Sequence, residues 1–178
     1  SKNLGALGEG GMIITSDKEL SNKAMLLRNY GQSTRYHADI HGINSRLHEM
    51  QAAILRVKLK HLDNWNNKRK KIAFLYSELL RDIIFTRYNP ESNYHLFVIR
   101  TKNRDRLIEY LKSKGITSLI HYPIPIHLQK AFYYLGKEGD FPNAEKFSKE
   151  ILSLPIFPEL TENEVRRVCE EIKSFYES

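Results

Sequence analysis

The chain of 178 residues has little cysteine: Cys169 is its only one. No disulfide can form within the chain, which excludes the class of small secreted domains that disulfides stabilise and fits a reducing compartment. Cys169 falls within a helical pattern. We therefore expect a buried structural thiol rather than a reactive one.

Long apolar runs are also lacking. The most apolar neighbourhood, residues 151–157, is interrupted by serine and proline, and it is far shorter than the roughly 20 residues of a membrane-spanning helix. No basic segment followed by an apolar one opens the chain, so nothing marks it for secretion. With 41% apolar and 28% charged residues, the composition predicts a globular protein, which we expect to be cytoplasmic.

Positive charge is in excess, because 28 Lys and Arg stand against 21 Asp and Glu and give a net charge of +7. Such a surplus attracts nucleic acid, an acidic membrane or a phosphorylated small molecule. The densest basic run is 68–71, whose side chains spread around a helix axis without the alternating aromatics that stack on bases. A solvated helix face is favoured, and a basic nucleic-acid-binding domain stays a lesser alternative.

The first 43 residues are expected to contain one strand, one helix and one loop. The apolar run Gly11–Thr15 predicts the strand. Ser16 and Glu19 have the spacing of a capping box, with Ser16 as the N-cap of a helix that ends near Gly31. Residues 32–43 are polar and aperiodic, which indicates a loop.

An amphipathic helical pattern begins near Ser45 and continues to residue 81, with a break expected at Asp63-Asn64. Strands are then predicted at 83–85, 94–99 and 116–120, and helices at 103–114, 144–152 and 162–176. Gly115 should end the first of these helices, and a second capping box at Thr161–Glu164 should begin the last. The alternation predicts a small α/β unit over residues 82–178.

Glycine is dense at the start of the chain, at Gly5, Gly8, Gly10 and Gly11. This spacing lacks the third glycine of the dinucleotide fingerprint and the Lys-Ser/Thr ending of the P-loop. It therefore predicts only a tight turn with positive φ.

Histidines raise the question of a metal site. His37 and His41 are four residues apart, but their stretch has no helical pattern and lacks the glutamate of a zinc-protease motif. We predict no metal site.

Three groups of residues, in the same order, resemble the DegT/DnrJ/EryC1/StrS family of sugar aminotransferases. The first is SKNLGALGEGG at 1–11. The second consists of RNYG at 28–31, GINSRL at 42–47 and QAAIL at 51–55. The third consists of HLFVIR at 95–100 and HYPIPIH at 121–127. The resemblance covers essentially the whole chain.

The resemblance implies a role for Lys2. It corresponds to the lysine that attaches pyridoxal 5'-phosphate and moves protons between substrate and cofactor, which requires a neutral amine. Family members that dehydrate sugars have histidine there, so Lys2 favours transamination. The alternative for Lys2 is an ordinary surface lysine.

Four further residues are assigned by the same resemblance. Asn44 is similar to the family asparagine that reaches across a dimer to the cofactor phosphate, and its alternative is a helix cap. His121, Tyr122 and His127 resemble the loop that borders the sugar-nucleotide site. Their alternative is a rigid proline loop packed on the core.

The implied architecture is α/β, the C-terminal part of a fold type I aminotransferase. Residues 1–44 would end the large cofactor-binding domain, 45–81 would connect, and 82–178 would form the small domain. The implied enzyme is a homodimer with shared active sites. It would move an amine from glutamate or glutamine to a keto-sugar nucleotide, most like a dTDP-3-keto-6-deoxyhexose.

The family's remaining cofactor contacts lie upstream of the lysine, so we expect these residues alone to be inactive. A non-catalytic regulatory or binding module of the same family is the main rival.

Overall fold

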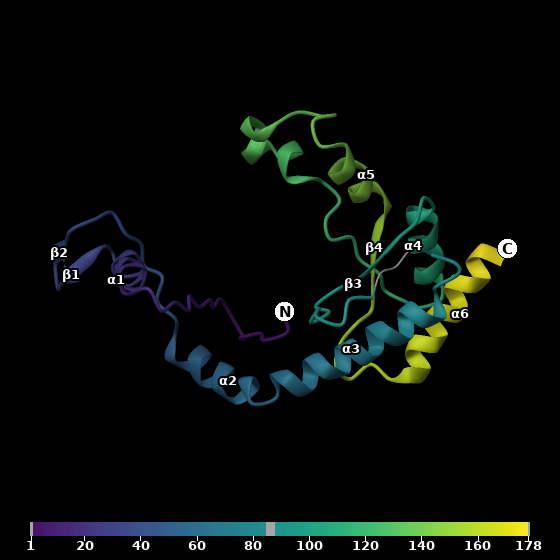
Figure 1. Cartoon of the computed structure of the whole chain (residues 1–178), viewed down its shortest axis with the longest axis horizontal. Helices are drawn as coiled ribbons and strands as arrows, with labels where there is room; N and C mark the ends of the chain where they lie inside the picture. Colours follow the sequence, from purple (N-terminus) through teal and green to yellow (C-terminus); the bar gives the residue numbers. More distant parts are fainter. Residues whose placement is uncertain (1, 85–87, 178) are drawn as a thin grey trace. The chain divides into compact units, whose positions relative to one another are not determined.

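The computed structural model describes residues 2–84 and 88–177. The chain divides into two compact units, residues 1–62 (unit 1) and 63–178 (unit 2), which are described separately. Their elements are labelled in Figure 1.

In unit 1, helix α1 (Lys18–Leu27) begins one residue later than a Ser16 cap requires. Its N-cap is Asp17, whose Oδ1 accepts hydrogen bonds from the backbone N–H groups of Glu19 at 2.8 Å and Leu20 at 3.1 Å. The Ser16 prediction is therefore wrong, because the carboxylate of the next residue satisfies two of the free amides of the first turn.

Two expectations for strands in unit 1 are also wrong. Residues 32–43, predicted as loop, contain the antiparallel pair β1 (Gln32–Thr34) and β2 (His37–Ala38). The run Gly11–Thr15, predicted as a strand, forms none, and no strand in the described part of the chain pairs with it. An apolar run becomes a strand only when a neighbour accepts and donates its backbone hydrogen bonds.

The long helical region is split as expected, but at a different place. Helix α2 (Glu49–Leu59) follows the N-cap His48, and helix α3 (Leu62–Leu79) begins after a turn at Lys60-His61 rather than at Asp63-Asn64.

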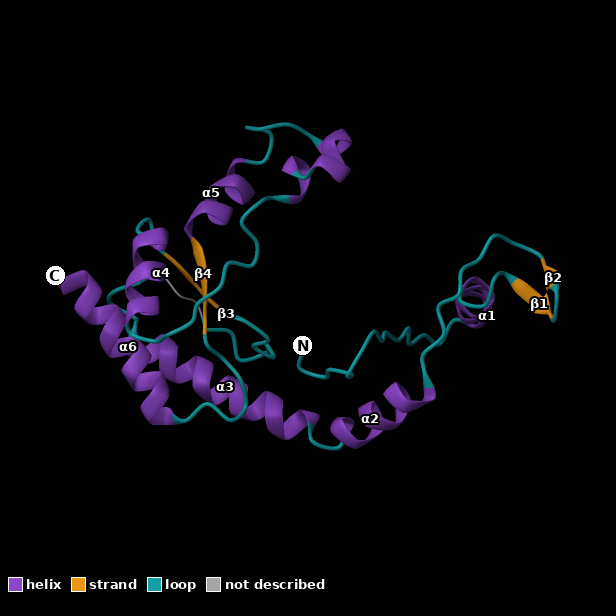
Figure 2. Ribbon diagram, turned by 180° about the vertical axis from the view of Figure 1, so that it is seen from behind, coloured by secondary structure: helices purple, strands orange, loops and turns teal. Residues whose placement is uncertain are grey.

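Unit 2 is built on the antiparallel pair β3 (Phe97–Arg100) and β4 (Ile151–Leu154), drawn in orange in Figure 2. Its helices are α3, α4 (Arg104–Ser113), α5 (Pro142–Glu150) and α6 (Glu162–Glu177), with 3-10 turns η1 (Ile126–Leu128) and η2 (Lys130–Leu135). Figure 1 shows η1, η2 and α5 as an arm that leaves the strand pair and returns to it.

The predicted strands and helices of unit 2 are confirmed in part. Strand β4 lies where the helix 144–152 was expected to end. The strand predicted at 116–120 is reduced to a single bridge between Leu119 and Ser153. Ile83 and Ile84 lie in a turn, and Phe85 is outside the described residues.

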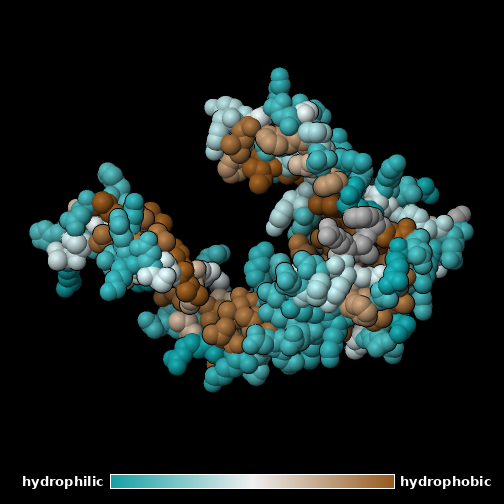
Figure 3. All heavy atoms as spheres, viewed as in Figure 1, coloured by the Kyte–Doolittle hydropathy of each residue, from teal (hydrophilic) through white to brown (hydrophobic). Residues whose placement is uncertain are grey.

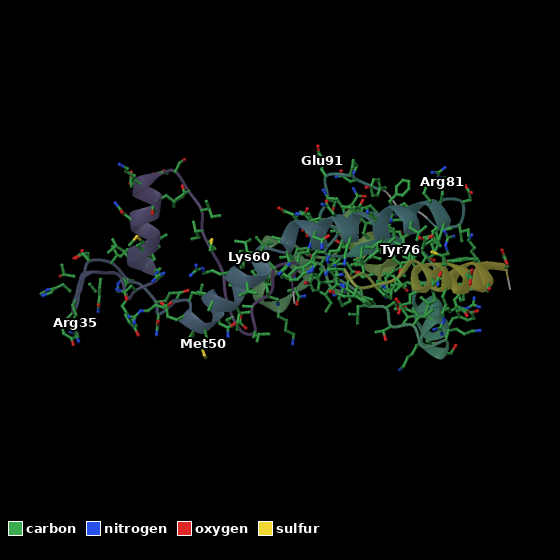
Figure 4. The ribbon with its side chains drawn as sticks, turned by 90° about the horizontal axis from the view of Figure 1, so that it is seen from below. Arg35, Met50, Lys60, Tyr76, Arg81 and Glu91 are labelled. Carbon is green, nitrogen blue, oxygen red and sulfur yellow. The ribbon has the colours of Figure 1, made fainter. Side chains whose placement is uncertain are left out.

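The core of unit 2 packs α3, α4 and α6 around the strand pair. Tyr76 of α3 is fully buried, stacks on Phe97 with ring centroids 5.0 Å apart, and donates a hydrogen bond to the carbonyl of Pro155 at 3.0 Å. Figure 4 shows Tyr76 among densely packed side chains. Cys169 is 1% exposed, and burial raises the pKa of its thiol to about 12, which confirms the prediction of a structural thiol.

The basic run 68–71 is not simply a solvated face, because Arg69 is buried. Its guanidinium donates to the carbonyls of Ile156 at 2.9 Å and Tyr94 at 3.3 Å. Burial lowers the pKa of Arg69, and Glu159 opposes this in part. Arg69 therefore ties α3 to the segments that flank both strands.

The ends of two helices in unit 2 follow the sequence-based expectation. The Thr161 and Glu164 side chains each accept the other's backbone N–H, at 3.3 and 2.8 Å, in the predicted capping box of α6. Gly115 adopts φ +73° after α4, which confirms the predicted cap. Within the described residues, no helix has both the length and the apolarity to cross a bilayer.

Candidate functional site

Lys2 is exposed and precedes a segment that lies along α2. The backbone N–H of Leu7 donates to Oε1 of Gln51 at 2.8 Å, and Nζ of Lys58 donates to the carbonyl of Gly5. Two of the stretches that carry the family resemblance, 1–11 and 51–55, are thereby brought into contact.

Glycine in this segment serves close packing rather than positive φ. A Cβ at Gly8 would lie 3.3 Å from Nε2 of Gln51, and one at Gly10 would lie 3.3 Å from Cδ1 of Leu47. Among the described glycines, those with positive φ lie elsewhere in the chain. The predicted positive-φ turn is therefore wrong. Glycine is needed at these positions for a different reason, because the lack of a side chain lets the backbone approach α2.

Asn44 lies where two further stretches of the resemblance run side by side. It forms an antiparallel bridge with Asn29, and the next residue, Ser45, donates its N–H to the carbonyl of Arg28 at 2.9 Å. Two glycines make this approach possible. A Cβ at Gly42 would lie 2.1 Å from the backbone nitrogen of Gly31, closer than any real contact.

The side chain of Asn44 is exposed, and Asn44 does not cap α2, whose N-cap is His48. The helix-cap alternative for Asn44 is thereby excluded. Its side-chain amide is therefore not used to cap the helix and can donate a hydrogen bond to a ligand.

In unit 2, β4 brings the two stretches of the third group together. Ser153 pairs with Val98 of β3 on one side and exchanges backbone hydrogen bonds with Leu119 on the other, at 2.7 and 3.1 Å. Its hydroxyl lies 2.9 Å from Nδ1 of His121. The peptide bond from His121 to Tyr122 is cis, and the Tyr122 side chain is 64% exposed.

His127 has a different environment from His121 and Tyr122. It is 6% exposed, its Nε2 lies 3.0 Å from Oε1 of Glu145, and its ring centroid is 4.7 Å from that of Phe141. The same carboxylate accepts the backbone N–H groups of Gly139 at 2.9 Å and Phe141 at 3.2 Å. Of the two readings of His127, the packed loop fits this environment better.

The charge on Glu145 is stabilised locally. Its partial burial acts to raise the pKa of Glu145, but the hydrogen bonds from His127, Gly139 and Phe141 outweigh burial and lower it. The carboxylate is therefore ionised at neutral pH and acts as an acceptor for both the loop and the turn before α5.

A groove of about 550 Å³ lies along the arm, and most of its lining is apolar. Side chains that line it include Tyr122, Ile126, His127, Leu135, Phe141 and Phe147. Two of the three predicted substrate-loop residues thus border one groove. In the described part of the chain, no group of three or more His, Cys, Asp or Glu side chains could hold a metal ion.

Two residues that contact the predicted site were not predicted from the sequence. They are Ser153 and Glu145. They lie 32 and 18 positions from their histidine partners. A serine inside an apolar strand run and a glutamate in the first turns of a helix carry no local signal of such contacts.

Comparison of the chain with known proteins identifies its relatives. Residues 1–173 match the model of the DegT/DnrJ/EryC1/StrS aminotransferase family. A "pleiotropic regulatory protein" of Geobacillus stearothermophilus is 48% identical over 99% of the chain and 50% of its own length. A dTDP-3-amino-3,4,6-trideoxy-alpha-D-glucose transaminase of Streptomyces venezuelae is 42% identical over 99% of the chain and 48% of its own length.

Solved structures agree. DesV of S. venezuelae, crystallised with a ketimine intermediate, matches 99% of the chain and 49% of its own length, with a TM-score of 0.93 and 41% identity. The chain thus spans about half the length of the relatives it matches. These matches confirm the predicted α/β fold of the fold type I aminotransferases. The chain belongs to the DegT/DnrJ/EryC1/StrS aminotransferase family.

Proposed function

We propose that the protein is a pyridoxal phosphate-dependent aminotransferase that moves an amine from glutamate or glutamine to a keto-sugar nucleotide. The observation that carries the proposal is an exposed Lys2 at the head of a matched segment that packs on α2. An accessible primary amine is what covalent attachment of an aldehyde cofactor requires.

The donors available in unit 1 suit that cofactor. Lys2 would hold it through Nζ, and the exposed Asn44 amide would donate a hydrogen bond to its phosphate without adding charge. When bound, pyridoxal phosphate supplies an electron sink for the carbon that carries the amine. Lys2 would take and return the proton at that carbon. A related NtdA structure from Bacillus subtilis, 28% identical with a TM-score of 0.89, contains the cofactor PMP, which supports this choice.

The second substrate would be a sugar nucleotide. Relatives include transaminases named for dTDP-linked sugars and a 3-aminotransferase named for a UDP-linked one. A 3-keto sugar is the proposed acceptor, with dTDP-3-keto-6-deoxyhexose as the narrower choice. His121 and Tyr122 are the residues proposed to contact the sugar nucleotide at this end of the site, with an imidazole and an exposed phenol that suit hydroxyl and phosphate oxygens, while the buried His127 belongs to the same loop.

A cytoplasmic homodimer with shared sites is the proposed assembly. Unit 1 supports it with large apolar side chains that face solvent in the single chain: Leu7, Met12, Ile13, Ile14, Met25 and Met50. Such side chains mark surfaces that are covered in an assembly. The proposed division is 1–44 in the cofactor domain, 45–81 as connecting helices and 82–178 as the small domain.

A regulatory or binding role is the second candidate. The names of two relatives favour it, the regulatory protein of G. stearothermophilus and a "sensory transduction protein", EryC1, of Saccharopolyspora erythraea, which is 46% identical. The presence of Lys2 favours catalysis. If replacing Lys2 abolishes the biological function of the protein, that function depends on catalysis; if the function survives, the regulatory or binding role is favoured.

The test is amine transfer in the intact protein. Incubation with ¹⁵N-glutamate and a panel of dTDP- and UDP-linked 3-keto sugars, followed by mass spectrometry, should reveal one ¹⁵N-labelled amino sugar. Lys2→Ala is the matched control and should give none. Absence of label in every sugar, with glutamate unchanged, would exclude glutamate as the donor, and the same result with glutamine labelled at its α-amine would exclude the proposed reaction.

A further inference from the structure

The loop 121–127 is held at both ends by side chains from elsewhere in unit 2. At one end, His121 meets the Ser153 hydroxyl, and at the other, His127 meets Glu145. We propose that Ser153 and Glu145 are positioning residues for this loop. In this arrangement His121 and Tyr122 face the sugar nucleotide while His127 is an anchor, an inference that rests on the proposed function.

Ser153 fixes His121 through three contacts. Its backbone N–H and C=O both form hydrogen bonds with the backbone of Leu119, two residues before His121. Its hydroxyl forms a hydrogen bond with Nδ1 of the His121 ring. Ser153 is buried, so its hydroxyl has few other partners to choose from. With Nδ1 engaged, Nε2 is the nitrogen of His121 left for a ligand.

Glu145 fixes the other end through a carboxylate with several donors. Both of its oxygens accept the N–H of Gly139, and Oε1 also serves Phe141 and His127. Because His127 is buried and its Nε2 is taken, its exposed surface is too small for it to be the main contact of a substrate. Its role is to hold the end of the loop.

Tyr122 lies between these two anchors with its side chain exposed. Pro123 and Pro125 restrict the backbone of the short stretch that follows it. A loop fixed at both ends and stiffened between them presents Tyr122 in one direction, which is what selective binding needs.

Ser153→Ala in the intact protein tests the first anchor, with Ser77→Ala as its control. Ser77 is also buried in unit 2, and its hydroxyl has no hydrogen-bond partner among the described residues. Loss of one hydrogen bond predicts a rise of about 3- to 10-fold in KM for the keto-sugar nucleotide. The half-reaction with glutamate should stay within about twofold, as for Ser77→Ala. Ser153→Thr keeps the hydroxyl and should restore KM.

Glu145→Ala tests the second anchor, with Glu150→Ala as its control. Glu150 belongs to the same helix but pairs with Arg100 instead of the loop. Glu145→Ala should raise KM for the sugar nucleotide, and Glu145→Gln, which keeps an acceptor oxygen, should raise it less. Equal impairment of both half-reactions, or equal effects of each variant and its control, would overturn the positioning roles.

A readout independent of catalysis separates this inference from the proposed function. Nitrogen chemical shifts of ¹⁵N-labelled histidines report which ring nitrogen carries the proton. Ser153→Ala should change the signals of His121 and leave those of His127, and Glu145→Ala should do the reverse. Unchanged signals in both variants would overturn the anchors even in an active enzyme. Shifts as expected in a protein that transfers no amine would overturn the proposed function alone.

Discussion

The two units differ in how much of themselves they bury. In unit 2 the three long helices share a core with the strand pair, whereas the only described residues buried in unit 1 are Gly5 and Gly31. Figure 3 shows apolar side chains on the visible face of unit 1, and Figure 4 shows Met50, which is 73% exposed, projecting from α2. The proposed cofactor residues Lys2 and Asn44 thus lie in the unit that buries almost none of its side chains, and the proposed substrate loop lies in the unit that has a core of its own.

The largest expected effect falls on chemistry in unit 1. Lys2→Ala should reduce amine transfer by about a thousandfold or more, since both cofactor attachment and proton transfer are lost. Because Lys2 is exposed, the unfolding midpoint of the cofactor-free protein should not change. Steady-state kinetics and thermal unfolding measure the two, and Lys18→Ala, an exposed lysine of α1, is the control. Retention of a large share of activity would remove Lys2 from the mechanism.

Unit 2 should respond in stability instead. Ile99 is fully buried in β3 and its neighbour Val98 faces outward. Ile99→Ala should cost about 2–5 kcal/mol of unfolding free energy, and Val98→Ala should cost under ~1 kcal/mol because it leaves no buried cavity. Denaturant unfolding of the intact protein provides both values. Similar costs at the two positions would mean that the outer face of β3 is also covered.

Mixing Asn44→Ala chains with inactive Lys2→Ala chains at limiting cofactor tests whether unit 1 depends on a partner copy. Asn44→Ala should weaken cofactor retention about tenfold, the value of one charge-assisted hydrogen bond. Combining Asn44→Ala with Lys2→Ala chains should restore part of the activity, because one site of a mixed dimer is then wild type. Activity after mixing is compared with each variant alone. No recovery despite demonstrated subunit exchange would place Asn44 outside a shared site.

The smallest effect concerns pH and unit 2. The pKa of Glu145 in the fold lies below its ordinary value of 4.5. Its stabilising contribution is therefore complete above about pH 5 and is lost as pH falls through the lowered pKa. Glu145→Gln should flatten the acid side of the stability profile measured by thermal unfolding. The pKa of Glu150 is also lowered, by its hydrogen bond to Arg100, so Glu150→Gln should remove a separate part of the same acid limb. An identical acid limb in Glu145→Gln and wild type would contradict the assignment.

Local signals in the sequence predicted the local parts of the fold. The Thr161 cap and the Gly115 end depend on residues within one turn of each other, and both were found where expected. Strand β4 was missed because a short apolar run fits a helix end as well as a strand. Its partner β3 lies about 50 residues away, and pairing across that distance leaves no periodic trace.

The candidate site shows the same division. Lys2, Asn44 and the loop residues were predicted by resemblance to a family, and their roles remain predictions. Ser153 and Glu145 could be found only from the fold, because contacts across 32 and 18 positions join different elements. The exposed run Gly11–Thr15 has the composition of a strand, but strand formation depends on a neighbour that its own residues do not specify.

The pairing of β3 with β4 has a consequence for how the arm can vary. Arg100 and Glu150, paired at the end of the strands, are 50 positions apart, and η1, η2 and α5 all lie in the loop that they close. The entropy of closing a loop grows only with the logarithm of its length, about 0.6 kcal/mol for each doubling. Inserting or removing a few residues between 128 and 141 would therefore change the closure cost by a small fraction of that amount. The length of the arm can thus vary at little cost in loop-closure entropy to the strand pair that closes it.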